Sequence, residues 1–264
     1  AGGVADPGLL LPAGAKAGFA GAIAGKPFFQ SLLGRDLQLW ADNPGAATKL
    51  YVLPRAALAL SGRSAQLCGP VEDWEELTLF LRFAGVEKLV TDRPAPLPLC
   101  GQLHLFGLGA GQSLPLAAPP ADLTLDRAPA IGAVAEMAFP GAENAARRDA
   151  FYSETCIAVA HGLARVWALR AADGCLVSMV GAYAMANGEA YLATGETVPE
   201  RRGQGIGGWL IPALAKALAA EGWQVTLLCE EKRCRFYTRL GFRPLGGYGQ
   251  YRLPEPRQDQ KEEP

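Results

Sequence analysis

The second half of the chain carries the clearer pattern of hydrophobic and polar positions. Apolar residues recur at helical spacing in 130–139 and again in 145–162. Three strand-like runs follow, and the turn residues between them, Ala-Asp-Gly and Asn-Gly, are typical of hairpins. These three predicted strands are 163–171, 175–186 and 189–198.

A glycine-rich loop comes next and precedes a third apolar helical pattern that ends near Glu221. The apolar run 223–229 predicts a strand, a short helix passes through Tyr237, and a last strand lies around 248–253. This order predicts antiparallel hairpins first and a parallel crossover afterwards. We therefore expect an α/β fold of the α+β kind, with a mixed sheet.

The first half repeats part of this order in a shorter form. Apolar residues at helical spacing, from Trp74 to Ala84, predict a helix over 71–84 that Gly85 ends. The strand-like runs on either side of this helix are 49–53, 56–62, 63–68 and 86–92. We expect a smaller α/β lobe in this half.

Residues 109–129 are rich in Pro, Gly and Ala and have little periodicity, which predicts a linker. The expected organisation is therefore an N-terminal accessory lobe at 1–125 and a second domain at 126–253. The last residues, 254–264, are polar and predict a solvated tail.

Composition and charge are those of a soluble globular protein. Half of the 264 residues are hydrophobic, and the formal net charge is −1, so no basic excess favours a nucleic-acid partner. The longest uncharged run, 94–121, contains six prolines and predicts no membrane-spanning helix. The apolar N-terminal stretch lacks the basic leader of a secretory signal. We expect a cytoplasmic protein with no membrane or nucleic-acid partner.

The cysteines and histidines predict no metal site. The six cysteines include no CxxC pair, and several lie in apolar strand-like runs, which favours reduced structural thiols. His104 and His161 are the only histidines, and neither has a neighbour at metal-ligand spacing.

The stretch VPERRGQGIGGWLIPAL, residues 198–214, indicates where the chemistry lies. The first amides of a helix have no partner within it, and the helix dipole adds a partial positive charge there. Glycine lets an anion approach these amides because it has no Cβ. With Arg201 and Arg202 beside it, the loop predicts an anion site, for which a pyrophosphate fits best. The alternative is a glycine-rich turn that only packs the helix on the sheet.

Two classes of glycine loop compete for this stretch. Gly203-x-Gly205-x-x-Gly208 satisfies the dinucleotide fingerprint, and Glu230 ends the next strand at a suitable distance. However, residues 199–202 separate the first glycine from its strand, and too little chain follows Glu230 for further strand–helix units. A nicotinamide-dependent oxidoreductase is therefore the less favoured alternative.

Arg202-x-x-Gly205-x-Gly207 resembles the acyl-CoA loop of the GNAT superfamily of N-acetyltransferases, whose pattern is Q/R-x-x-G-x-G/A. A second stretch, RFYTRLGF at 235–242, is similar to that family's late FYxxxGF motif. The resemblance covers roughly 128–253, and the predicted strand order agrees with it. It implies a GNAT-like acyl-CoA N-acyltransferase fold in the second half.

The resemblance also implies an activity, a co-substrate and a binding site. The activity is transfer of an acetyl group from acetyl-CoA to a small-molecule or peptide amine, by direct attack in a ternary complex. A CoA-binding regulatory protein without turnover is the alternative function. The protein could assemble as a homodimer. The strand ending at Val198 is expected to splay from its parallel neighbour and admit the pantetheine. The residues implied for CoA binding are Thr197, Val198, Arg202, Gly203, Gln204, Gly205, Gly207 and Gly208.

Two catalytic candidates follow. Tyr237 occupies the place of the family's usual proton donor for the departing thiolate; the less favoured alternative is that it only fills the core. Glu196 is the sole acid in its strand and is a candidate general base, although it could equally be an edge carboxylate paired with an arginine. Glu154 is a weaker candidate for the base. Cys229 and Cys234 are expected to be structural thiols.

Two interpretations of the N-terminal lobe remain: it is a degenerate GNAT-like lobe, or it is an unrelated α/β cap. Its predicted helix opens with four carboxylates in residues 72–76. These carboxylates would cap the helix dipole themselves and repel a phosphate. We therefore expect this lobe to hold no CoA.

Overall fold

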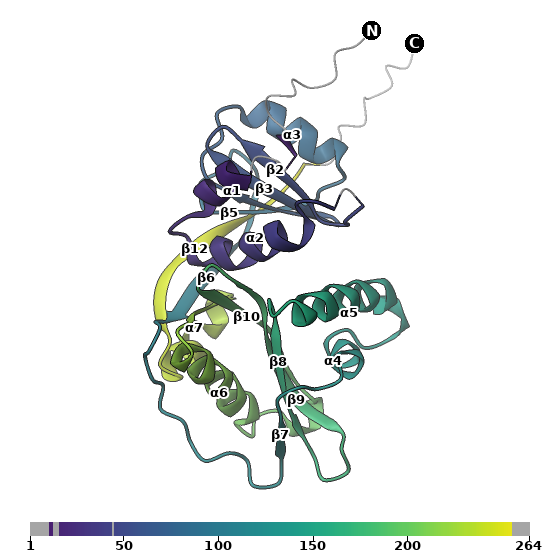
Figure 1. Ribbon diagram of the computed structural model, residues 1–264, viewed down its shortest axis with the longest axis vertical. Helices are drawn as coiled ribbons and strands as arrows, with labels where there is room; N and C mark the ends of the chain where they lie inside the picture. Colours follow the sequence, from purple (N-terminus) through teal and green to yellow (C-terminus); the bar gives the residue numbers. More distant parts are fainter. Residues whose placement is uncertain (1–10, 13–15, 44, 255–264) are drawn as a thin grey trace. The chain divides into compact units, whose positions relative to one another are not determined.

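The computed structural model describes residues 11–12, 16–43 and 45–254. Over these residues the chain follows one order of elements twice (Figure 1). The first pass comprises β1 (Leu11–Pro12), α1 (Lys16–Ile23), α2 (Pro27–Trp40), β2 (Lys49–Leu53), β3 (Ala56–Ser61), β4 (Ser64–Cys68), α3 (Trp74–Phe83), β5 (Lys88–Thr91) and β6 (Leu99–Leu108).

The second pass repeats this order with one helix added before its last strand. It comprises β7 (Thr124–Asp126), α4 (Ile131–Ala138), α5 (Ala145–Ala160), β8 (Arg165–Arg170), β9 (Leu176–Ala186), β10 (Glu189–Thr197), α6 (Ile206–Ala220), β11 (Gln224–Cys229), the added helix α7 (Glu231–Arg239) and β12 (Arg243–Arg252). Short 3₁₀ turns at Ala142–Asn144 and Pro199–Arg201 precede α5 and α6.

Backbone contacts group the chain into two compact units. Unit 1 takes its described residues from Ala1–Ala24, Asp36–Leu103 and Gly247–Pro264, and unit 2 comprises Gly25–Arg35 and His104–Gly246. These units are discontinuous along the chain, whereas the predicted boundary between 125 and 126 is a single cut. That boundary stays a prediction.

The strands of each unit are arranged in the same way. In unit 2 the order is β6-β11-β10-β9-β8-β7; the pairs from β7 to β10 are antiparallel, β10 and β11 are parallel, and β6 is antiparallel to β11. In unit 1 the order is β12-β5-β4-β3-β2-β1, with only β4 and β5 parallel. A helix, α6 or α3, connects the parallel pair. The mixed α/β sheet predicted from the pattern is confirmed.

Each unit is completed by the last strand of the other pass. Residues His104–Leu108 of β6 belong to unit 2 and pair with β11. Residues Gly249–Arg252 of β12 belong to unit 1 and pair with β5. The sequence pattern gave no strand at β6, and it placed a linker over 109–129, where β7 forms a strand paired with β8. On these two points the prediction is wrong.

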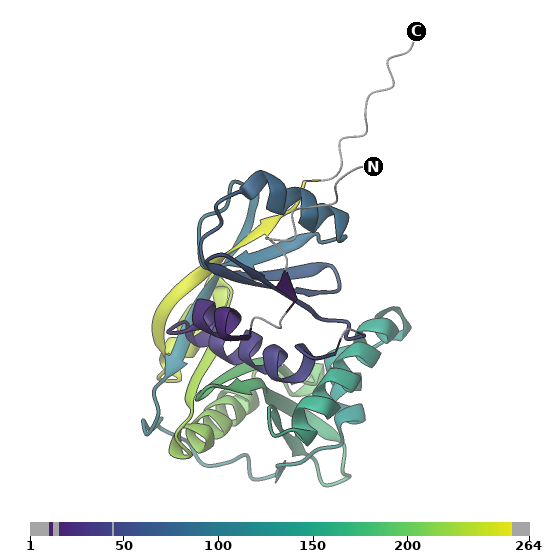
Figure 2. The ribbon, with the colours of Figure 1, turned by 45° about the horizontal axis from the view of Figure 1, so that its top comes forward.

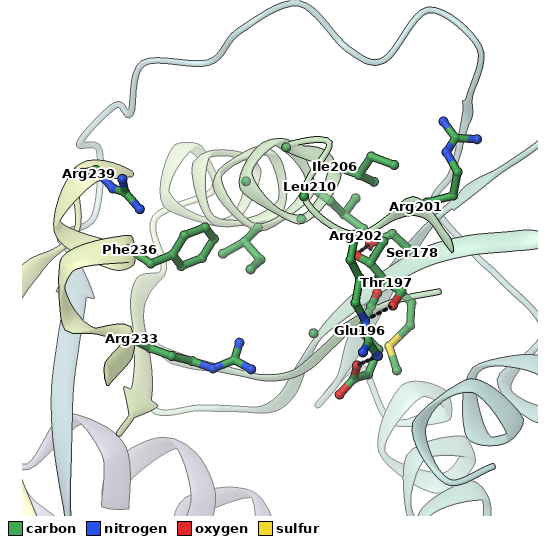
Figure 3. A pocket seen from close by; sticks show the side chains of 17 residues that line it. Ser178, Glu196, Thr197, Arg201, Arg202, Ile206, Leu210, Arg233, Phe236 and Arg239 are labelled. Atoms are coloured by element: carbon green, nitrogen blue, oxygen red, sulfur yellow. Dashed lines mark hydrogen bonds and ion pairs between the residues drawn. The ribbon is translucent and has the colours of Figure 1, made fainter. Parts of the chain in front are cut away.

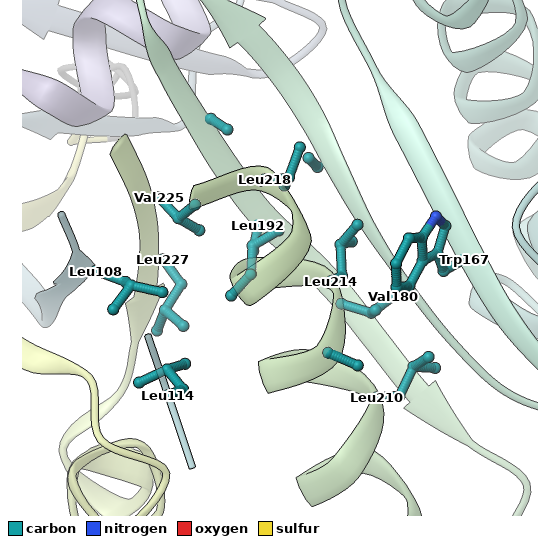
Figure 4. Packing of buried hydrophobic residues seen from close by; sticks show 14 of the residues in the cluster. Leu108, Leu114, Trp167, Val180, Leu192, Leu210, Leu214, Leu218, Val225 and Leu227 are labelled. Carbon is teal, nitrogen blue, oxygen red and sulfur yellow. The ribbon is translucent and has the colours of Figure 1, made fainter. Parts of the chain in front are cut away.

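The core of unit 2 lies on both faces of its sheet. Helix α6 presents Leu210, Leu214 and Leu218 to the sheet residues Leu192 and Leu227 (Figure 4). On the opposite face, where Figure 1 shows α4 and α5, a second cluster forms. Its buried members are Val134, Val166, Ala168, Met179 and Tyr183. The sheet that carries the candidate site is therefore packed on both sides.

The core of unit 1 follows the same plan. Leu77 and Leu81 of α3 are fully buried and pack in one cluster with Leu58 of β3. Figure 2 shows α3 on one face of this sheet and α1 on the other. Asp73 caps α3 by accepting a hydrogen bond of 2.9 Å from the Glu76 amide, so the predicted self-capping by a carboxylate is confirmed. The helix begins at Trp74, later than predicted.

None of the helices in the described part of the chain has the length and apolar character needed to cross a membrane.

Candidate active site

The candidate site begins where two parallel strands of unit 2 part. β10 and β11 pair from Glu189 and Gln224 to Leu192 and Leu227. Beyond Leu192, β10 stays with β9 through an irregular stretch in which Thr194 has a positive φ of 48°. The predicted splay of these two strands is therefore confirmed, and the irregular stretch turns β10 away from its parallel neighbour.

The glycine loop follows directly from the splayed strand. Gly203 and Gly205 have φ values of 78° and 76°, in the left-handed region that only glycine adopts without strain. Gly205 is the N-cap of α6, and the first helical bond runs from the Trp209 amide to the Gly205 carbonyl, 3.0 Å away. The amides of residues 206–208 come before this bond, so they have no hydrogen-bond acceptor within the helix.

Arg201 fixes the outside of the loop. Its guanidinium donates to the Asp122 carboxylate at 2.6 Å and to the Gln204 side-chain oxygen at 2.8 Å. The hydrogen bond from Arg201 lowers the pKa of the Asp122 carboxyl. Gln204 is thus held through its side chain, and it does not line the cavity described below.

Arg202 ties the loop back to the end of β10. Its Nε donates to the Thr197 carbonyl at 2.9 Å, and its Nη2 lies 3.6 Å from the Glu196 carboxylate. Ser178 of β9 supports the same strand end, since its hydroxyl lies 2.9 Å from the Thr197 hydroxyl. The amide of Val198 donates to the Val177 carbonyl of β9, so it faces away from the splay.

These residues enclose a cavity of about 710 Å³ at the start of α6 (Figure 3). It brings together most of the residues that the sequence predicted. Those lining it are Glu196, Thr197, Arg202, Gly203, Gly205, Gly207 and Gly208, whereas Val198, Gln204 and Tyr237 do not. The binding and catalytic roles of all these residues stay predictions.

Helix α7 supplies a second wall that sequence reasoning missed. Arg233, Phe236 and Arg239 line the cavity and project toward it in Figure 3. Their spacing of three residues places them on one helical face, and this periodicity was the available signal. With Arg201 and Arg202 on the other side, four arginines surround the cavity, which makes it an attractive site for an anion.

Tyr237 lines a smaller cavity of about 150 Å³. Gly195 and Ile211 line both cavities, so the two adjoin. Tyr237 packs edge-on against Phe242, and burial raises the pKa of its hydroxyl. Burial also raises the pKa of Tyr191, which lines the same space. Both hydroxyls therefore keep their protons at neutral pH.

The structure shows Glu196 in an ion pair, but it leaves both predicted roles open. Its side chain is 45% exposed, and its contact with Arg202 is that of an edge carboxylate paired with an arginine. The same carboxylate lines the cavity, where an incoming amine could reach it. Glu154 does not line either cavity.

The two cysteines at the end of β11 are close together. The sulfur atoms of Cys229 and Cys234 lie 3.9 Å apart. Burial and the contact with Cys234 raise the pKa of the Cys229 thiol to about 12. A thiol in this state is a poor nucleophile, which agrees with the structural role predicted for it.

The doubly repeated mixed sheet, with a splayed parallel pair over a glycine-rich helix start, defines the fold as GNAT-like. Residues 162–244 match the family model described as an acetyltransferase (GNAT) domain. The second half of the chain is therefore similar to a GNAT acetyltransferase domain, as the motifs predicted. An acyltransferase is the enzyme class that this domain supports. No curated protein matches the chain in sequence.

Solved structures share the fold over most of the chain. A GCN5-related N-acetyltransferase from Kribbella flavida is 16% identical, with a TM-score of 0.57 over 90% of this chain and 97% of that one. A tandem GNAT protein from the clavulanic acid biosynthesis pathway is 15% identical, with a TM-score of 0.56 over 85% and 88%. A GNAT-family acetyltransferase from Colwellia psychrerythraea is 14% identical, with a TM-score of 0.52 over 86% and 93%. Since these likenesses span both passes, the N-terminal lobe is consistent with a tandem GNAT arrangement.

Proposed function

We propose that the second half of this protein transfers an acetyl group from acetyl-CoA to an amine, by direct attack of the amine on the thioester in a ternary complex. The observation that carries this proposal is the start of α6. There, the amides of residues 206–208 have no partner within the helix. These residues line a cavity that is surrounded by arginines.

The helical glycines support a ligand at this point. A Cβ on Gly207 would meet only the Thr197 hydroxyl, at 3.6 Å, and one on Gly208 would meet Leu240 at 3.8 Å. Both are ordinary contacts, so the fold has room for a side chain at either position. Each glycine costs the helix about 0.5–1 kcal/mol relative to alanine. A pyrophosphate that approaches the main chain closely would explain why both positions lack a Cβ.

The remaining parts of CoA match the rest of the site. The open edge of β10 beyond Leu192 offers main-chain groups to the pantetheine, in the manner of an added strand. The arginines of α7, Arg233 and Arg239, would meet phosphoryl groups from the side opposite Arg202. Because the Val198 amide is already bonded to Val177, the contribution of Val198 would come from its carbonyl or side chain.

The chemical step needs a neutral amine, a polarised thioester and a proton for the departing thiolate. We assign the proton to Tyr237, which burial keeps protonated and whose cavity adjoins the larger one. Glu196 would accept the proton of the amine directly or through a water molecule. No step requires a covalent enzyme intermediate, in keeping with the protonated state of Cys229.

The proposal is tested by Gly207→Ala. The added methyl group fits the fold and favours the helix, so the free energy of unfolding should stay equal or rise by up to about 1 kcal/mol. It would occupy the space of the phosphoryl groups, so the affinity for CoA, measured by calorimetry, should fall by about tenfold or more. Gly132→Ala is the matched control, because Gly132 also lies in the first turn of a helix with room for a Cβ, in α4.

Equal CoA affinity in Gly207→Ala and Gly132→Ala would overturn the proposed CoA site. A panel of amines and polyamines, assayed by thiol release, then tests turnover. CoA binding without thiol release for any amine would favour the regulatory protein. Thermal protection by NADH in the absence of protection by CoA would favour the oxidoreductase.

A further inference from the structure

Three side chains with metal-binding atoms meet where β6, β11 and α7 come together in unit 2, and Cys229 lies beside them. Nε2 of His104 lies 2.7 Å from a carboxylate oxygen of Glu231. Together with the sulfur of Cys234, these ligand atoms all lie within 4.8 Å of one another. The sulfur of Cys229 lies 3.9 Å from that of Cys234, beside this group of three.

The fold, rather than any spacing in the sequence, assembles this group. Cys229 and His104 are directly opposite each other in the antiparallel pairing of β11 with β6, so their side chains share one face of the sheet. Glu231 and Cys234 are three residues apart at the start of α7, which places them on one face of that helix. The expectation of no metal site rested on sequence spacing alone, and it did not include the pairing that brings His104 to this position.

Two of the distances are close to those around a tetrahedral ion, and Cys229 would have to approach His104 and Glu231 to complete the set. At the bond lengths that zinc forms with sulfur, nitrogen and oxygen, neighbouring ligand atoms lie roughly 3.3–3.8 Å apart. The two sulfurs are already at about this separation. His104 and Glu231 are closer, at hydrogen-bond distance, and must move apart by on the order of half an ångström. The Glu231 side chain is 83% exposed, so it can make this movement without disturbing the core.

We propose that Cys229, Cys234, His104 and Glu231 form a binding site for a zinc ion. The mixed set of two sulfurs, one imidazole and one carboxylate is typical of a borderline-soft ion with tetrahedral preference, and it excludes calcium and magnesium, which prefer oxygen ligands alone. A bound zinc ion displaces the thiol protons when it coordinates cysteine. Because Glu231 is exposed and His104 and Cys234 are part-buried, the ion has a path from solvent.

The site would act as a clamp on α7. This helix carries Arg233, Phe236 and Arg239, which line the larger cavity, and Tyr237, which lines the smaller one. An ion coordinated by its first turn and by the ends of β6 and β11 would fix the helix to the sheet. The inference concerns a site separate from the proposed CoA cavity, and zinc binding can be measured whether or not the protein uses CoA.

The experiment uses the full chain, kept reduced and stripped of metal with a chelator. Zinc chloride and cobalt chloride are then added separately. We expect one zinc ion per chain, and a cobalt spectrum with a thiolate-to-metal charge-transfer band and the visible bands of a tetrahedral ion. His104→Ala and Cys234→Ser should each weaken zinc binding by more than the roughly 10- to 100-fold that loss of an outer-shell partner costs. Zinc should raise the thermal midpoint of the wild type and have less effect on either variant.

His161→Ala and Cys156→Ser are the matched controls, because they change the same residue types in and beside α5, away from the cluster. Both should keep wild-type zinc affinity. Circular dichroism establishes that each variant is folded before it is compared, and both cluster variants replace partly exposed side chains. Zinc affinity that is the same in the wild type and the cluster variants would overturn the proposal. So would a cobalt spectrum with no thiolate band, or a Cys229–Cys234 disulfide that persists under reductant.

Discussion

At the scale of single residues, the role proposed for the hydroxyl of Tyr237 predicts that turnover can be lost without loss of CoA binding. Tyr237 lines the smaller cavity, whereas the residues whose amides are proposed to bind the anion line the larger one. Tyr237→Phe should therefore lower kcat by about 10²- to 10³-fold and change the CoA dissociation constant little. Steady-state kinetics and calorimetry on the same preparations measure the two effects.

The direction of the pH dependence follows from the raised pKa of Tyr237. In the proposed mechanism the donor is the protonated hydroxyl, which is present below that pKa and lost above it. The kcat of the wild type should therefore decline only above about pH 10, and this decline should be absent in Tyr237→Phe. Tyr152→Phe, which alters a tyrosine 47% exposed on α5, should behave as the wild type. An unchanged kcat in Tyr237→Phe would assign the residue to the core instead.

The two roles open to Glu196 give different kinetic results in Glu196→Gln. If the carboxylate is the general base, as we expect, kcat falls by about 10²-fold or more while the CoA dissociation constant changes little. If it only pairs with Arg202, 3.6 Å away, kcat stays constant and the CoA dissociation constant changes. Glu200→Gln, in the adjacent 3₁₀ turn, controls for loss of one negative charge near the loop. A variant with wild-type kcat would remove Glu196 from the chemistry.

The sequence predicted the loop side of the site but not the α7 side. Gly203 and Gly205 are local requirements of the backbone, which needs a positive φ at each, so a short motif contains them. Arg233 and Arg239 reach the cavity only because α7 packs beside α6, and a motif cannot express that packing. His104 is the extreme case, since its neighbours Cys229 and Glu231 are more than a hundred residues away along the chain.

At the scale of elements, the start of β10 carries a buried acid whose ionisation affects stability. Glu189 is 8% exposed and accepts one bond of 3.3 Å from Gln224, and its second oxygen has no partner among the described residues. Burial raises the pKa of this carboxyl to about 7. Between about pH 4.5 and 7 the folded protein therefore holds a proton that the unfolded chain has lost. Stability must fall as pH rises through this window and then level off.

Glu189→Gln imitates the protonated acid and should remove that fall. We expect the variant to be more stable than the wild type at pH 8, by on the order of 1–3 kcal/mol, and nearly equal to it at pH 5. Urea unfolding at the two pH values measures the difference. Glu72→Gln, at an exposed position before α3, should leave the wild-type profile unchanged. A pH-independent difference between Glu189→Gln and the wild type would contradict the assignment.

The elements that sequence reasoning found and missed differ in how local their causes are. Strands β8 to β11 and helix α6 lie close to their predicted bounds, because apolar periodicity and hairpin turns mark them. The pattern missed β6, which contains Gly101 and Gly107, and the first part of β12, which contains Gly246; the predicted strand around 248–253 covers only the second part of β12. These two strands are stabilised by pairing with residues far away in the sequence. A short stretch of sequence gives little sign of pairing with residues so far away.

At the scale of the whole molecule, the repeated order of elements makes the first pass a counterpart of the second. α3 crosses between β4 and β5 as α6 crosses between β10 and β11. However, α3 is capped by Asp73, and a cavity of only about 100 Å³ lies near its start, lined in part by Glu72 and Asp73. Acidic groups there would repel a phosphate, so the proposed CoA site belongs to the second pass alone.

The exchange of β6 and β12 decides how the chain can be divided. A cut at the predicted boundary, between 125 and 126, falls within β7 and separates β11 from its partner strand β6. The fragment 126–253 would then expose the edge of β11 and lose Phe106, Leu108 and Leu114 from the core around α6. An unpaired apolar strand edge is prone to aggregate. We therefore expect 126–253 to be insoluble, or to unfold without a cooperative transition.

Co-expression of 1–125 with 126–253 is the control for this experiment. Strand pairing requires no covalent link between the two pieces, so the pair should assemble as a soluble complex that unfolds cooperatively. Size-exclusion chromatography and thermal unfolding measure both results. If 126–253 alone is monomeric and melts as the full chain does, the second half completes its own sheet, and β6 is dispensable to it. That outcome would also leave the zinc site without His104, so the same fragment should then bind zinc more weakly than the full chain.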